Sequence, residues 1–354
     1  MSDFTKNGYA YIQNLIDEAV KGNKNEVTIS GKWEIDDAIR IPSNFTIYLK
    51  DCHLRLADGC FCNIFVNENN ETDLGKTTDG TNEKISIIGV GEAILDGGNY
   101  NGLGEKIRPD GCTAPVYKNN LILFTNVSGF TIKNLSCRNQ RWWALNFIYC
   151  AFGNIENIDF CACDIRIDEN GVARHGLLRK NYSQILVKNA DGIDIRKGCH
   201  DITIQNITGF TEDDTVALTG LNTYIEEPFI VPSLPSDICR ITIKNVRSQA
   251  FCTGVRLLSQ DGIKLYDIVV DGVTDESRNS AHMDYGLYAV RVGDKHLYGK
   301  RFSTKDEVYK ITVKNIYGDG EYALALAGEI GNLQVSNIAS GSNAGLILDE
   351  RTIE

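Results

Sequence analysis

Short segments with alternating apolar side chains recur along the chain, and each ends in an Asn or Gly followed by another apolar residue. Alternation with a period of two is typical of β-strands with one buried face. A repeat of this kind indicates a solenoid, in which each unit buries its apolar face against its neighbours. The segments align on Asn134, Asn157, Asn206, Asn245, Gly272, Asn315 and Asn337.

The distances between successive aligned positions are 23, 49, 39, 27, 43 and 22 residues. The short distances predict a coil of about 22 to 27 residues. We interpret the distance of 49 as two coils, with the extra coil in the segment QILVKNADGIDI. We interpret 39 and 43 as one coil plus an insertion.

A second apolar strand follows most of the aligned positions, for example in DGIDI, DDTVAL and TGVRLL. Several short strands per coil, with no helical periodicity after residue 25, predict an all-β fold, a single parallel β-helix over residues 1–354. Residues 8–22 are the exception, because the apolar residues from Ile12 to Val20 share one helical face. We expect this helix to cap the open N-terminal end of the solenoid.

Three insertions interrupt the repeat, at residues 164–183, 221–237 and 274–307. Loops inserted into a solenoid project from its surface and commonly build the binding site. We therefore expect these insertions to line a cleft.

Composition narrows the classes of partner. A net charge of −11 and a pI of about 5.1 argue against general binding to nucleic acid or to an acidic membrane. The N-terminus has no basic region followed by an apolar run, and no apolar stretch is long enough to span a bilayer, so we expect a cytoplasmic protein. The sequence is compatible with a homo-oligomer.

The eleven cysteines do not form a recognisable metal-binding set. Cys60 with Cys62, and Cys161 with Cys163, have the closest spacing, but the second half of a zinc set is missing. We expect reduced thiols, as in a reducing compartment, and no metal or cofactor.

Acidic residues gather in the segments NADGIDI and EDDTVAL. Asp191 precedes Asp213 by 22 residues, about one coil, so it should stack beside Asp213 and Asp214 on strands about 4.8 Å apart. Carboxyls at that range disfavour one another's ionisation, and at least one pKa should be raised. A protonated acid beside ionised acids suits glycoside hydrolysis. We interpret Asp194 and Asp201 as turn residues.

These segments resemble the polygalacturonase family of pectin-degrading glycoside hydrolases, whose pattern has an Asn-Thr-Asp-Gly segment and an Asp-Asp segment one coil later. The segments NQRWWALNFIYCAFGNIENI and ISIIGVGEAILDGG resemble earlier family coils, and the likeness runs from about residue 8 to 260. The resemblance implies a right-handed parallel β-helix. It also implies that Asp213 is the general acid, and that Asp191 and Asp214 activate water on the opposite face, which gives inversion.

The residues that would bind and recognise the sugar differ from those of the family pattern. The family has Gly-His-Gly in the coil after Asp-Asp, where this chain has FCTGVRLLS, with Cys252 or Thr253 near the histidine position. The family then has Arg-Ile-Lys, which binds the substrate carboxylate, and no such triplet occurs in this chain. Arg256 and Arg291 are the candidates to replace it, and coil counting does not decide between them. The sequence therefore indicates a substrate other than plain polygalacturonate.

Further candidate substrate-binding residues surround this set. Asn189 belongs to the family-like segment, and Tyr288 begins the strand YAVRV. Trp142 and Trp143 open an earlier strand, where alternation would send one ring inward and one outward to stack on a sugar. His175 lies in the basic segment ARHGLLRK, which could reach over the acids.

The predicted function is hydrolysis of a glycosidic bond in a pectin-related or other oligosaccharide or polysaccharide, by exo action on short substrates. One alternative is a β-helix lyase or epimerase, which would use a Lys, Arg or Tyr base, often with calcium. Another is a non-catalytic carbohydrate-binding β-helix, which would bind sugar without turnover. A transglycosylase would yield disaccharide anhydrides instead of reducing sugar.

Overall fold

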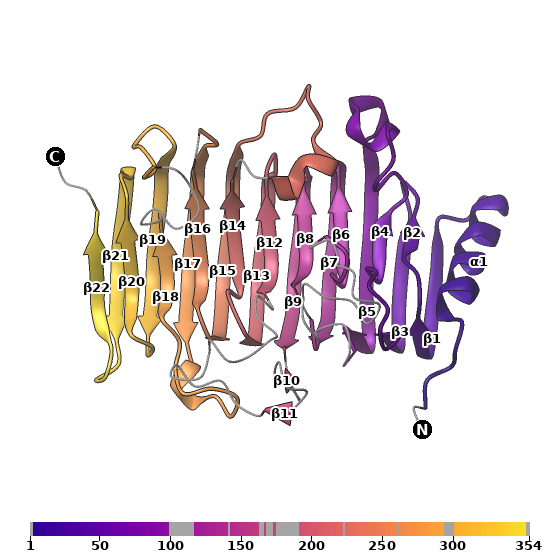
Figure 1. Cartoon of the computed structure of the whole chain (residues 1–354), viewed down its shortest axis with the longest axis horizontal. Coiled ribbons are helices and arrows are strands. Elements are labelled where there is room, and N and C mark those ends of the chain that lie inside the picture. The colour runs from indigo at the N-terminus through magenta and orange to yellow at the C-terminus, as the bar shows by residue number, and fades with distance from the viewer. Residues whose placement is uncertain are drawn as a thin grey trace.

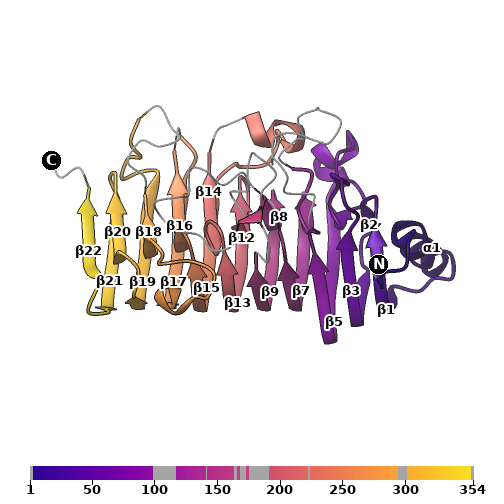
Figure 2. The ribbon, with the colours of Figure 1, turned by 60° about the horizontal axis from the view of Figure 1, so that its bottom comes forward.

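The computed structural model describes residues 3–98, 117–140, 142–162, 166–167, 173–174, 191–221, 224–260, 262–293 and 301–351. Within them, two parallel ten-stranded sheets run side by side along an elongated solenoid (Figures 1 and 2). Sheet A contains β1 (Glu26–Ile35), β3 (Thr46–Leu56), β5 (Asn82–Asp96), β7 (Val127–Arg138), β9 (Ala151–Cys161), β13 (His200–Thr211), β15 (Ile238–Ala250), β17 (Leu265–Asp275), β19 (Val308–Gly318) and β21 (Gly331–Ser340).

Sheet B is built from shorter strands, and its strand order also follows the chain. It contains β2 (Ile39–Ile41), β4 (Phe65–Asn67), β6 (Ile122–Thr125), β8 (Trp143–Ile148), β12 (Asp191–Arg196), β14 (Val216–Gly220), β16 (Thr253–Ser259), β18 (Tyr288–Val292), β20 (Tyr322–Ala327) and β22 (Gly345–Glu350). Each coil thus adds one strand to each sheet, and the predicted parallel β-helix is confirmed.

One prediction about the repeat is wrong. The 49 residues between Asn157 and Asn206 make one coil with an insertion, because β9 pairs directly with β13 and β8 pairs directly with β12. The distances of 39 and 43 residues are each one coil with an insertion, as predicted, because β13 pairs with β15 and β17 pairs with β19.

The aligned Asn residues bend the long strands of sheet A. Each has a positive φ, between 52° and 59°, which Asn tolerates better than most residues. Their carboxamides form a ladder in which Asn157 donates to Asn134 at 2.9 Å. Asn206 donates to Asn157 at 3.0 Å, and Asn245 donates to Asn206 at 2.7 Å. The sequence anchor is therefore a structural element that holds successive coils in register.

Apolar side chains from alternate strand positions fill the space between the sheets as one long core. Beneath the middle of sheet B, Phe147 stacks on Phe130 with ring centroids 4.8 Å apart, and Phe124 meets Phe147 edge-on at 6.0 Å. All three rings are buried. Phe147 is also the Cα partner of Ile195, so this packing supports the strand that begins at Asp191.

Helix α1 (Gly8–Lys21) lies at one end of the solenoid beside β1 (Figure 1). It buries Ile12 and Ile16 in the same core, so the predicted N-terminal capping helix is confirmed. Among the described residues, no helix has the length and apolar character needed to cross a membrane.

Insertions leave the coils at both ends of the sheet B strands (Figure 1). The 221–237 insertion follows the end of β14, whereas β10 and β11, an antiparallel pair in the 164–183 insertion, precede the start of β12. The range 274–307 is not one loop, because β18 divides it into a part before that strand and a part after it. The short elements are β10 (Arg166–Ile167), β11 (Ala173–Arg174) and the 3-10 helices η1 (Leu74–Lys76), η2 (Thr78–Gly80), η5 (Tyr224–Phe229) and η6 (Ser277–Asn279).

Candidate active site

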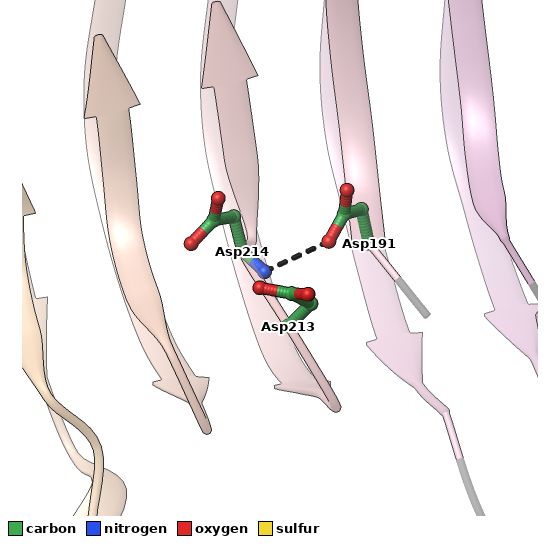
Figure 3. A group of neighbouring side chains, drawn as sticks. All are labelled: Asp191, Asp213 and Asp214. Atoms are coloured by element: carbon green, nitrogen blue, oxygen red, sulfur yellow. Dashed lines mark hydrogen bonds between the residues drawn. The ribbon is translucent and has the colours of Figure 1, made fainter. Parts of the chain in front are cut away.

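Three carboxyls meet at the start of two neighbouring strands of sheet B (Figure 3). Asp191 is the first residue of β12, and Asp213 and Asp214 come just before β14. One oxygen from each carboxyl lies within 4.8 Å of the others. The backbone N–H of Asp214 donates to Oδ1 of Asp191 at 2.9 Å. The structure therefore brings together the trio that the sequence singled out.

The strand register explains this meeting. Gly192 N–H donates to the carbonyl of Asp214 at 3.0 Å, and Ile193 N–H donates to the carbonyl of Thr215 at 2.9 Å. A Cβ on Gly192 would lie only 2.4 Å from the Thr215 carbonyl oxygen, so any larger residue would push the two strands apart. The Asp-Gly pair thus places a carboxyl next to a position at which only glycine permits close approach.

The residues on the β16 and β18 side of the trio are basic and aromatic. Arg256 Nη1 lies 3.4 Å from Oδ2 of Asp214. Arg256 and Arg291 are Cα partners on neighbouring strands, as are Thr253 and Tyr288. The guanidinium of Arg291 lies 5.5 Å from the centre of the Tyr288 ring. Arg256 and Arg291 need not be alternatives for binding a sugar carboxylate, because both lie on this side of the trio.

The three carboxyls differ in their electrostatic surroundings. Burial, and then repulsion by Asp214, raises the pKa of Asp213 to about 7, although Arg256 opposes this rise. Burial also raises the pKa of Asp214, against the attraction of Arg256 and a hydrogen bond from Thr253. For Asp191, burial and the neighbouring acids hold the pKa well above its usual range. Groups this close titrate as a set, in which Arg256 favours the ionised forms of both Asp213 and Asp214.

The family described as glycosyl hydrolases family 28 matches residues 34–227, more than half of the chain. This protein belongs to glycosyl hydrolase family 28. It is therefore a glycoside hydrolase, and the predicted polygalacturonase-like family is confirmed. The matched range contains the aspartate trio and ends before Arg256 and Arg291. No curated protein matches the sequence.

Solved structures share the fold of this family 28 hydrolase. A 1,3-alpha-1,4-beta-D-galactose-4-sulfate-3,6-anhydro-D-galactose-2-sulfate 4 galactohydrolase has 12% identity and a TM-score of 0.62 over 98% of this chain and 89% of that chain. An exopolygalacturonase from Thermotoga maritima has 13% identity and a TM-score of 0.57 over 98% and 88%. The tailspike protein of E. coli bacteriophage HK620 has 12% identity and a TM-score of 0.62 over 98% and 60%. Identities this low show a common fold alone.

Asp194 of the family 28 hydrolase is not a turn residue, so that interpretation is wrong. It lies inside β12, is 1% exposed, and is held by Arg196 Nη1 at 3.2 Å. Burial raises its pKa well above the usual range, and Arg196 opposes the rise. Asp201 is not a turn residue either, because it is the second residue of β13, where it has φ 55° and pairs with Arg240 at 2.7 Å.

The alternation expected for the two tryptophans is also wrong. Both Trp142 and Trp143 are 7% exposed, and neither belongs to the apolar core between the sheets. Trp143 is the Cα partner of Asp191, and the Arg196 guanidinium lies 4.1 Å from its ring centre. Alternation fails because β8 begins at Trp143, so Trp142 lies before the strand.

Two predicted site residues, His175 and Asn189, lie outside the described residues. Of the cysteine pairs, Cys60 and Cys62 have sulfurs 3.0 Å apart, and Cys163 also falls outside the described residues. The aspartate trio also has the spacing of a cation site, since one oxygen from each carboxyl lies within 4.8 Å of the others.

Sequence reasoning missed three buried polar residues near the trio. Asn146 is the Cα partner of Asp194 and is fully buried, and Arg196 and Glu226 pair at 2.8 Å. The i, i+2 spacing of Asp194 and Arg196 on one strand face could have indicated their pairing. Glu226 gives no such signal, because it comes from an insertion 30 residues further along the chain.

Proposed function

We propose that this hydrolase cleaves an acidic oligosaccharide from one chain end, with inversion at the anomeric carbon. The observation that supports this most directly is an acid with a pKa of about 7, Asp213, beside Asp214 and its Arg256 partner. Hydrolysis needs both a proton donor and a carboxylate base near one bond. Lyase chemistry would need a Lys, Arg or Tyr base instead of a carboxyl trio.

In the proposed reaction, Asp213 gives its proton to the glycosidic oxygen as the bond from that oxygen to the anomeric carbon breaks. A water molecule attacks the anomeric carbon from the opposite face. Asp191 and Asp214 hold this water, and Asp214, whose ionised form Arg256 favours, accepts the proton that it loses. The products are an alcohol on the leaving sugar and a free anomeric hydroxyl, and the proton on the base returns to Asp213 through solvent.

Inversion is tested by the first anomer formed. The trio is compact, within 4.8 Å, whereas the carboxyls of inverting enzymes are commonly about 6.5 to 9.5 Å apart and those of retaining enzymes about 5 to 5.5 Å. This spacing makes retention the second candidate. A reducing-sugar screen over pectic and other acidic oligosaccharides should identify a substrate, and proton NMR during the first turnovers should show the inverted anomer. Retained anomer would reject inversion, and sugar binding without turnover at any pH would support a non-catalytic protein.

The pKa of Asp213 predicts the alkaline limit of activity. The general acid must carry its proton, so kcat/KM should fall as the pH rises through about 7, by about tenfold per pH unit. Rates measured between pH 4 and 9 on the best substrate check this limb. A profile that stays flat up to pH 9 would show that Asp213 is not the acid.

The paired arginines predict an anionic group on the substrate. Arg256 and Arg291 lie side by side on β16 and β18, and two guanidinium groups suit a sugar carboxylate. Arg291→Gln should lower kcat/KM about tenfold or more on the acidic substrate, and much less on its methyl ester. Equal losses on acid and ester would contradict the assignment. Arg240→Gln, on sheet A, is a control of the same chemistry.

Exo action is supported by unequal burial along the face of sheet B. Towards β8, Asn146 and Trp143 are buried, whereas towards β18 Arg256, Tyr288 and Arg291 are half-buried. A face that is closed on one side of the carboxyls and more open on the other suits a chain end. Product analysis on a long substrate should give one small product from the start, and a ladder of intermediate lengths would indicate endo action.

A further inference from the structure

Arg196, the last residue of β12, is almost fully buried at 3% exposure, yet the proposed reaction does not use it. Its Nε donates to Oε1 of Glu226 at 2.8 Å, and its Nη1 donates to Oδ1 of Asp194 at 3.2 Å. The guanidinium plane also covers the ring of Trp143, 4.1 Å from the ring centre. One side chain therefore holds three groups from three separate parts of the chain.

Glu226 belongs to η5, so Arg196 connects the 221–237 insertion to sheet B. The insertion has other contacts on the outer face of the sheet, since Phe229 packs edge-on against Tyr117 at 5.0 Å and Ser236 hydrogen-bonds to the Tyr149 hydroxyl at 2.9 Å. Both contacting residues of the insertion, Phe229 and Ser236, come after Glu226 in sequence. The Arg196–Glu226 pair adds a charged contact near the start of the insertion, and it reaches the strand that carries Asp191.

The other two partners of Arg196 lie against the catalytic carboxyls. Asp194 is close enough to Asp191 to contribute to the raised pKa of that carboxyl. Trp143 is the Cα partner of Asp191. A shift of Asp194 or of the Trp143 indole would therefore change the packing and the electrostatic potential around Asp191.

Stability alone does not account for this arrangement. Burying a guanidinium and two carboxylates costs a large desolvation energy, and apolar side chains of similar size are often as stable or more so. Arginine supplies a planar fork that fixes two carboxylates and stacks on a ring at once, whereas lysine offers a single point charge. The arrangement is suited to fixing orientation.

We propose that Arg196 is a positioning residue: it fixes Asp194 and Trp143 beside Asp191 and ties the 221–237 insertion to the active-site wall through Glu226. The expected effect of Arg196 on the rate of hydrolysis rests on the proposed function. Its attachment of the 221–237 insertion to sheet B does not depend on that function.

The test compares Arg196→Gln, Arg196→Lys and the double variant Arg196→Gln/Glu226→Gln with the wild type. Arg196→Gln leaves two buried acids without their cation and should lower the melting temperature. The double variant removes one of these acids and should recover most of the lost melting temperature. A displacement of about 1 Å at an active site costs about 100-fold in rate, so kcat/KM of the double variant should stay about 100-fold low, mainly through kcat. Arg196→Lys should have a melting temperature and a kcat/KM between those of the wild type and Arg196→Gln, because lysine keeps the charge but lacks the planar fork of donors.

Arg138→Gln is the matched control, because Arg138 also pairs with an aspartate, Asp159, at 2.8 Å, but on sheet A. It should leave kcat and KM unchanged. If the double variant recovers kcat together with its melting temperature, Arg196 only balances charge and the proposal is overturned.

Limited proteolysis with chymotrypsin separates this inference from the proposed function. In the folded double variant, cleavage after Phe229 should be at least about tenfold faster than in the wild type, since the insertion has lost its charged tie. Unchanged cleavage would overturn the tie to the insertion whatever the activity. Faster cleavage in a protein that hydrolyses no glycan would support the tie while rejecting the hydrolytic function.

Discussion

Replacing Asp213 with Asn is expected to lower kcat/KM by about 10² to 10⁴-fold, because the amide keeps the shape of the neutral acid and cannot release a proton. Asp213 lies half-buried just before β14, so the fold should be retained. Steady-state rates on the best oligosaccharide, with circular dichroism to check folding, measure the effect. Unchanged activity in the folded variant would reject the assignment of Asp213.

The choice of leaving group sharpens this experiment. An aryl glycoside with an acidic phenol leaves without protonation, so Asp213→Asn should lose far less activity on it than on the natural linkage. Asp201→Asn is the matched control, because Asp201 pairs with Arg240 on sheet A, away from the trio. That variant should hydrolyse both substrates at wild-type rates.

Replacing Phe147 with Ala is expected to lower the free energy of unfolding by about 3 to 5 kcal/mol. Phe147 is fully buried, stacks on Phe130 and meets Phe124 edge-on, so truncation leaves a cavity that neighbours in two sheets cannot easily fill. Urea denaturation of the variant and the wild type measures the loss.

Phe152→Ala provides the comparison for the core variant. Phe152 is 61% exposed, so the same truncation at this position should change the unfolding free energy by only about 0.5 kcal/mol. A loss below about 1 kcal/mol for Phe147→Ala would mean that the aromatic stack contributes little to the core.

The aspartate trio could be predicted because a solenoid converts sequence period into spatial proximity. Asp191 and Asp213 are one coil apart, and the register between β12 and β14 places them together. The same logic gave both sheets, since alternation marks a buried strand face wherever it occurs. Local pattern and global fold agree at these positions.

Other features depend on contacts that no local pattern encodes. The segment QILVKNADGIDI alternates like a coil, yet β9 pairs directly with β13, so alternation alone does not count coils. Asp194 sits mid-strand because Arg196 offsets its burial, and Arg196 in turn needs Glu226 from an insertion. Whether a charged side chain can be buried depends on partners that are distant in sequence, and a single sequence does not reveal those partners.

The asparagine ladder has a consequence for how this architecture changes during evolution. The ladder bond is 2.9 Å where its two residues are 23 apart in sequence, 3.0 Å where they are 49 apart and 2.7 Å where they are 39 apart. Coil stacking is thus indifferent to how much chain is inserted between two coils. Insertions can therefore change in length by dozens of residues while the three carboxyls keep their spacing. New specificities can arise by exchange of insertions beside an unchanged set of catalytic residues.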